Sequence, residues 1–280
     1  MLDRAIAREP VVIHGFRVVP LGSVSPGFKA GLRRLAAKGF VDDSCTIVKT
    51  ASGPRSGITH AGGRYVHPLN AYAESVAATM REQGLEIPPM PFLVAPGAGT
   101  LFHEFGHHVD HVWSREERAI LFSFRWFSRF YWVSVRPRTL VAGELHRGAP
   151  GPIRTEEDAT TAALVWGRSA SELFADLFED WVRAEGRCSF DCCDPSLLNG
   201  TGTEGSARLE LLPGADADTV RETTYALFRE GLGGAIQLPE VRGDLFGEHT
   251  AMILGSLERA MEHLRGQAAD TACAESPTQG

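Results

Sequence analysis

The segment from Thr100 to Asp110, TLFHEFGHHVD, places two histidines four residues apart with a glutamate directly after the first. On an α-helix, positions i and i+4 lie about 40° apart around the axis, so His103 and His107 project from one face where one zinc ion can bridge them. Glu104 lies about 100° from His103, at the edge of this face. A carboxylate there can accept a proton from a water bound to zinc, because the metal lowers the pKa of that water to about 7. The pattern predicts hydrolytic chemistry with one zinc per chain, His103 and His107 as ligands and Glu104 as general base.

The rest of this helix fits a site that faces a cleft. Asp110 is seven residues after His103 and returns to the same face, where it is a candidate acceptor for the second ring nitrogen of a ligand. Gly106 would allow another helix to pack closely. His108 and His111 are interpreted as surface histidines of this helix. The apolar residues fall on the opposite face: Leu101, Phe102, Phe105, Val109 and Val112.

A catalytic zinc needs a third protein ligand. The longer motif with a third histidine is excluded, because position 113 is a tryptophan. In the segment SELFADLFE, Glu172 and Asp176 lie four apart on one face of a predicted helix, opposite a row of apolar side chains. Glu172 could then bind the metal and Asp176 could orient an imidazole, although Glu172 could equally belong to a capping box that begins at Ser169. The competing carboxylates are Glu144, Glu156, Asp176 and Glu179.

These two segments, HEFGHHVD and WGRSASELFADLFEDW, resemble the catalytic domains of the anthrax lethal factor family, a branch of the Glu-liganded zinc metallopeptidases (gluzincins). That family pairs a HEFGH-type helix with a glutamate on a later E-x-F-A-x-x-F helix, and the run from Glu172 to Phe178 matches it. The resemblance covers roughly residues 58–183. It implies a zincin fold, a cleft between an edge strand and the active-site helix, Glu172 as the third ligand, and hydrolysis of a peptide bond in a protein or peptide substrate.

The chain departs from the family at the residue that stabilises the oxyanion. Relatives of lethal factor carry a tyrosine shortly before the ligand glutamate, whereas the nearest aromatic residue here is Trp166, which has no hydroxyl group. The candidates for this role are Tyr131, His108, His146 and Arg168. The departure leaves room for a zinc enzyme of small-molecule metabolism on the same scaffold. A non-catalytic binding module with a structural zinc is a third hypothesis, which the presence of Glu104 disfavours.

The elements that must position these residues indicate an α+β, zincin-like domain, mostly helical with a small mixed sheet. Short strands are expected within residues 44–67, and the strand over 59–67 is expected at the sheet edge, where it precedes the active-site helix. A single domain over 1–266 and a disordered tail over 267–280 are expected. Helices are predicted over 24–38, 69–83, from near Thr100, 114–133, 156–166, 170–185, 217–230 and 248–265.

Charge and composition exclude several other classes of protein. The formal charge of −7 disfavours a nucleic-acid partner, because phosphate contacts need a concentrated basic surface. We find no secretory signal and no stretch long enough to cross a membrane, which favours the cytoplasm. A protein delivered to another cell by a non-classical route can also lack such a signal. The five cysteines form no disulfide framework, and Cys188, Cys192 and Cys193 are interpreted as loop thiols rather than as a second zinc site. The oligomeric state is left open.

Overall fold

The structure is a computed structural model of the chain that describes part of its 280 residues. Contacts divide the chain into two compact units, and the expectation of a single domain over 1–266 stays a prediction. The first unit comprises Met1–Trp113, Glu172–Phe190 and Asp218–Gln237, and the second comprises Ser114–Ser171, Asp191–Ala217 and Leu238–Gly280. The described residues are 9–50, 63–68, 73–82, 85–114, 121–135, 138–141, 144–147, 156–184, 207–212, 214–234 and 236. Among these, the side chains of 132–147, 156–168, 184 and 207–210 lie outside the description.

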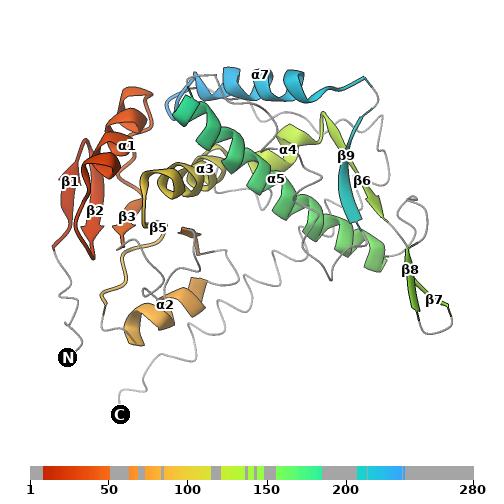
Figure 1. The fold of residues 1–280 in the computed structure, drawn as a ribbon, viewed down its shortest axis with the longest axis horizontal. Coiled ribbons are helices and arrows are strands. Elements are labelled where there is room, and N and C mark those ends of the chain that lie inside the picture. Colours follow the sequence, from red (N-terminus) through yellow and green to blue (C-terminus); the bar gives the residue numbers. More distant parts are fainter. Residues whose placement is uncertain are drawn as a thin grey trace, which may run out of the picture. The chain divides into compact units, whose positions relative to one another are not determined.

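A five-stranded mixed sheet forms the first unit's framework (Figure 1). Its strands are β1 (Val11–Ile13), β2 (Phe16–Pro20), β3 (Thr46–Lys49), β4 (Arg64–Val66) and β5 (Phe92–Ala95). The strand order is β1-β2-β3-β5-β4, with β2, β3 and β5 parallel and the two outer strands antiparallel to their neighbours. The prediction of a small mixed sheet is confirmed, and β4 lies at its edge, before the helix that carries the two histidines.

The two faces of this sheet are covered by different helices. Helix α2 (Ala73–Glu82) packs on one face, where Val76 and Met80 join a buried cluster with Val48 and Val94. Helix α3 (Ala98–Ser114) packs on the other face, where the Phe105 ring lies 5.8 Å from the ring of Phe16 on β2. Strand residues alternate between faces, so Tyr65, which pairs with Leu93 in the register, points toward α3.

Helix α1 (Pro26–Ala37) confirms the helix predicted over 24–38. Ser25 is the N-cap, its side chain accepts a hydrogen bond from the N–H of Phe28, and Pro26 occupies the first turn. The helix packs against α3 through small residues, since a Cβ added at Gly31 would lie 3.4 Å from the Phe102 ring. Helices α2 and α7 (Ala217–Phe228) likewise confirm the helices predicted over 69–83 and 217–230.

Helix α5 (Glu156–Ala184) crosses α3 at a glycine. A Cβ added at Gly106 would lie only 2.7 Å from the Cα of Ala175, so the two helices approach closely because this position has no side chain. The sequence predicted two helices, 156–166 and 170–185, but the structure has one continuous helix. The prediction is wrong because nothing between Trp166 and Ala170 breaks a helix, as Gly167 lowers helix stability by only about 1 kcal/mol.

An aromatic cluster joins α3, α5 and α7 in the first unit. The Phe228 ring of α7 lies 5.1 Å from Phe174, 5.2 Å from Phe178 and 6.0 Å from Trp113. Aromatic pairs at such distances contribute about 0.5–1.5 kcal/mol each beyond the burial of their surface. The aromatic cluster (Trp113, Phe174, Phe178 and Phe228) therefore holds the second half of α5 against α3.

The second unit corrects the helix predicted over 114–133. Helix α3 ends at Ser114, α4 covers only Phe122–Phe127, and Tyr131–Val135 is strand β6, antiparallel to β9 (Ala207–Leu211). The sequence YWVSV is aromatic and β-branched, a composition that favours a strand when a partner strand is present. A further antiparallel pair is formed by β7 (Arg138–Val141) and β8 (Glu144–Arg147).

Several predictions fall on residues outside the described part of the chain. These are the helix at 248–265, the tail at 267–280, and the loop thiols Cys188, Cys192 and Cys193. Cys45 is described, and its free thiol is fully buried. None of the described helices combines the length and the apolarity that a membrane span requires.

Candidate metal centre

Helices α3 and α5 bring three predicted ligands together in the first unit. The Glu172 carboxylate oxygen Oε2 lies 3.3 Å from Nε2 of His103 and 3.8 Å from Nε2 of His107. One donor atom from each of the three residues lies within 4.8 Å of the other two. Ligand atoms about 2.0–2.1 Å from a tetrahedral zinc ion are about 3.3–3.5 Å apart. The donor set and its spacing therefore fit a zinc ion, which these three residues would hold.

Asp176 lies behind the His103 ring. Its carboxylate oxygen Oδ1 is 2.9 Å from Nδ1 of His103, a hydrogen-bond distance. A hydrogen bond at Nδ1 fixes the tautomer and the ring orientation, and directs Nε2 toward His107 and Glu172. This is the arrangement that the sequence predicted for Glu172 and Asp176, four residues apart on α5.

A second group of donors competes for the same histidine. Glu179 lies 3.8 Å from Nδ1 of His103 and, with Asp176, forms another set with metal-binding spacing. Glu179 is also ion-paired with Arg183 on the next turn of α5. Because Asp176 already lies within hydrogen-bond distance of Nδ1 and Glu179 is ion-paired with Arg183, the Nε2 side of His103 is better suited to a metal ion than the Nδ1 side.

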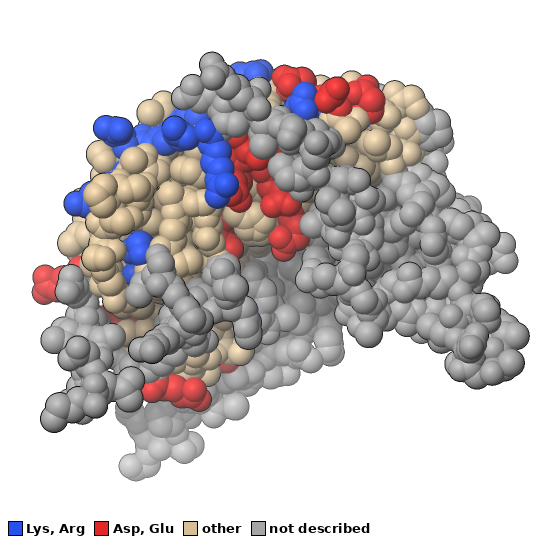
Figure 2. Space-filling model, in the orientation of Figure 1, with Lys and Arg blue, Asp and Glu red and all other residues tan. Residues whose placement is uncertain are grey.

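The carboxylates of α5 are more exposed than the Glu104 carboxylate on α3. Glu172 and Asp176 are 38% and 29% exposed, whereas Glu104 is 7% exposed. In the space-filling view, acidic side chains gather beside a group of Lys and Arg side chains on the face shown (Figure 2).

Burial raises the pKa of Glu104 to about 7, against the opposing effect of the nearby His103. A carboxylate with a pKa near neutrality suits a general base at physiological pH.

The pKa values of His103 and His107 are shifted in opposite directions in the metal-free protein. Burial lowers the pKa of His103, but its hydrogen bonds with Asp176 and Glu172 outweigh burial and raise this pKa to about 10. Burial lowers the pKa of His107 to about 4. His107 is therefore a neutral donor at pH 7, whereas a metal ion must displace a proton from His103.

Three side chains, Asp42, His108 and Tyr65, form a hydrogen-bonded chain in which His108 of α3 is the middle member. Nε2 of His108 is 2.9 Å from Oδ2 of Asp42, and Nδ1 of His108 is 3.3 Å from the Tyr65 hydroxyl. His108 is 1% exposed, so the interpretation of this residue as a surface histidine is wrong. The helical period placed it away from the apolar face, but Asp42 and Tyr65 provide polar partners that allow burial there.

His111 and His67 lie further along the same side of α3. Their rings stack with centroids 4.2 Å apart, and His111 also lies 5.2 Å from the ring of Tyr65. Burial lowers the pKa of His111 well below its usual value, so its ring is uncharged at neutral pH. Asp42 and Tyr65 were not predicted as site residues, because Asp42 belongs to a loop 66 residues before His108 and carries no recognisable motif.

The remaining predicted residues are placed as follows. Asp110 is fully buried on α3, and its role toward a ligand nitrogen stays a prediction. Among the oxyanion candidates, His108 has hydrogen-bond partners at both ring nitrogens, which argues against that role. Tyr131 is buried in the second unit, where its ring packs on Phe127 at 6.1 Å. The side chains of His146, Arg168, Glu144 and Glu156 lie outside the description.

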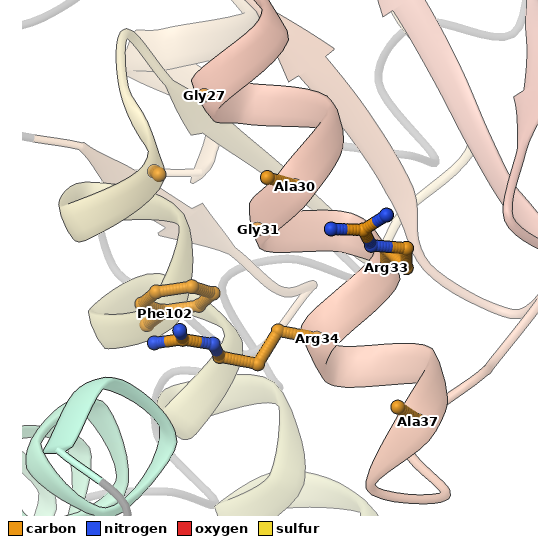
Figure 3. Close-up of a pocket in the computed structure, with 8 residues that line it drawn as sticks. Gly27, Ala30, Gly31, Arg33, Arg34, Ala37 and Phe102 are labelled. Atoms are coloured by element: carbon orange, nitrogen blue, oxygen red, sulfur yellow. The ribbon is translucent and has the colours of Figure 1, made fainter.

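A pocket of about 450 Å³ lies between α1 and α3 and contains none of the candidate ligands. Phe102 and the small residues Ala30 and Gly31 line it, with Arg33 and Arg34 on the α1 side (Figure 3). Arg34 also donates hydrogen bonds to the carbonyl oxygens of Val182 and Arg183, at 3.3 and 2.8 Å. Its guanidinium group thereby caps the last turn of α5, a favourable position for a cation.

Comparisons with known proteins found none that is similar to this chain. No family model matches the chain, and neither the curated proteins nor the solved structures contain a match.

Proposed function

We propose that this protein is a zinc-dependent peptidase with a zincin-like scaffold that hydrolyses a peptide bond in a protein or peptide. The observation that carries the proposal is the convergence of His103, His107 and Glu172 at the ligand spacing of tetrahedral zinc, with Glu104 next to it. A purely structural zinc site has no need for a general base. The sequence likeness to the lethal factor family supports the same conclusion.

Zinc, Glu104 and Asp176 would each have a separate role in the proposed reaction. Zinc, when bound, would supply a Lewis acid that lowers the pKa of water and polarises a carbonyl group. Glu104 would accept a proton from the attacking water and transfer it to the leaving nitrogen as the C–N bond breaks. Asp176 would keep His103 in its ligating tautomer.

Replacement of the base tests the reaction. We expect Glu104→Gln to retain zinc and its fold but to lose at least about a hundredfold in peptide turnover, because glutamine cannot accept the proton. The assay is cleavage of a peptide library by zinc-loaded protein, with zinc content measured on the same samples. Turnover within about threefold of the original protein would show that Glu104 is not the base.

Removal of the third ligand tests the metal site itself. In Glu172→Ala only two histidines remain, so zinc affinity should collapse, whereas Asp176→Ala should lose about ten- to a hundredfold in affinity. Glu222→Ala, which removes an exposed carboxylate from α7, is the matched control and should keep its zinc. Full zinc occupancy in Glu172→Ala would remove this residue from the ligand set. The capping-box alternative is wrong, because Ser169 lies inside the continuous helix α5 and not at a helix N-terminus.

A further inference from the structure

Tyr65 is attached to helix α3 at two points. Its side-chain hydroxyl lies 3.3 Å from Nδ1 of His108, and its backbone N–H donates a hydrogen bond to the Glu104 carboxylate. Glu104 and His108 are four residues apart, so they lie one above the other on the same face of the helix. The edge strand β4 therefore rests on α3 through a side-chain contact and a backbone contact, one helical turn apart.

The third member of the chain determines the direction of these hydrogen bonds. Asp42 accepts from the backbone N–H of Ser44 through Oδ1 at 2.8 Å, and its Oδ2 faces Nε2 of His108. An ionised carboxylate can only accept, so Nε2 must carry the proton. In the neutral tautomer Nδ1 is then an acceptor, and the Tyr65 hydroxyl donates to it. Each of the three side chains therefore has a hydrogen-bond partner within the chain.

We propose that the Asp42–His108–Tyr65 chain positions the general base, by fixing the backbone of Tyr65 from which Glu104 receives its hydrogen bond. This inference rests on the proposed function. Strand β4 is three residues long, so its pairing with β5 supplies few hydrogen bonds. The chain supplies the second attachment, and its members act through Glu104 rather than on the substrate.

Hydrogen exchange of the Tyr65 backbone amide tests the attachment without any need for enzymatic activity. In Tyr65→Phe and Asp42→Ala, we expect the exchange protection of this amide, measured by NMR, to fall at least about tenfold, because β4 can move away from Glu104. Asp43→Ala, which truncates the exposed neighbour of Asp42, is the matched control and should leave protection unchanged. Protection within about twofold of the original protein in both test variants would overturn the proposal.

Kinetics then separate positioning from a merely structural role. With a cleaved peptide, both test variants should lose about tenfold or more in kcat, with KM within about twofold and zinc content unchanged. Asp42→Asn should recover part of the rate, because its amide oxygen can still accept from His108. A lower Tm with unchanged kcat, or a loss of zinc together with kcat, would overturn the proposal. If the original protein cleaves no peptide, the proposed function fails, and amide exchange still decides whether the chain holds Tyr65 against Glu104.

Discussion

Substitution of Gly106 by alanine should damage the metal centre from outside it. The added Cβ would lie 2.7 Å from Cα and 3.2 Å from the carbonyl oxygen of Ala175, and 3.2 Å from Cβ of Phe178. Ordinary contact begins at about 3.4 Å, so α3 and α5 must separate by about 0.7 Å at this crossing. The first atom met is backbone, and no side-chain rotation can relieve the contact.

The stability change has two opposing parts. Alanine stabilises a helix interior by about 1 kcal/mol relative to glycine. Overpacking of a tight core typically costs about 1–3 kcal/mol. Because backbone atoms and the buried Phe178 must all shift, we expect the cost to dominate, with a net loss of about 1–2 kcal/mol in the free energy of unfolding. Urea denaturation of the metal-free protein measures this difference.

The separation of α3 and α5 should affect zinc binding more than it affects stability, since ligand distances must be correct to about 0.2 Å. Gly106 precedes His107, and Ala175 lies one turn after Glu172, so the separation acts directly on the 3.8 Å gap between these ligands. We expect zinc affinity, measured by competition with a chromophoric chelator, to fall at least about tenfold. Gly27→Ala on α1, where an added Cβ meets nothing within 4 Å, is the matched control. A Gly106→Ala protein with full stability and unchanged zinc affinity would refute the reasoning.

Three other predictions concern ionisable groups whose pKa values are shifted. Burial raises the pKa of the Cys45 thiol, so a thiol reagent should modify this residue only after unfolding, as peptide mapping would reveal. The hydrogen bond with His108 lowers the pKa of Asp42 from 3.8 to about 2, so its stabilisation is present above about pH 4 and lost as the pH falls toward 2. After allowance for solvent screening this is about 1 kcal/mol, and the stability difference between the original protein and Asp42→Asn should shrink over that range. Finally, because the pKa of His103 is about 10 in the metal-free protein, zinc binding at pH 8 should release about one proton, measurable by calorimetry in two buffers of different ionisation enthalpy.

The helical period explains why part of the site could be predicted from the sequence. His103, Glu104 and His107 lie within one turn of one helix, so their mutual placement depends only on local geometry. The proximity of Glu172 to them depends on how α5 packs, and the sequence could indicate it only through a family likeness. The contact between Asp42 and His108 joins a loop to a helix 66 residues later, and no periodicity encodes such a contact.

The fold, like the site, could be predicted where it depends on local sequence patterns but not where it depends on contacts between distant segments. Segments with clear amphipathic periods, such as the segment that forms α1, were predicted correctly. The aromatic run after Ser114 was assigned to one helix, because large apolar residues occur at spacings that suit either a helix or a strand. Tyr131–Val135 becomes a strand because β9, more than 70 residues away, pairs with it. Pairing of this kind is tertiary information that a local pattern does not contain.

The aromatic cluster can form only late in protein synthesis, because its members lie far apart in the sequence. Trp113, Phe174 and Phe228 are synthesised about 60 and 50 residues apart, and the first emerges long before the last. A nascent chain that ends before α7 has both histidines and Glu172 but lacks Phe228, which packs α5 against α3. Such a chain keeps the direct contact between α3 and α5 at Gly106 and lacks the packing that Phe228 adds. If the proposed site binds zinc, a chain that ends before α7 should release it faster than the complete protein does.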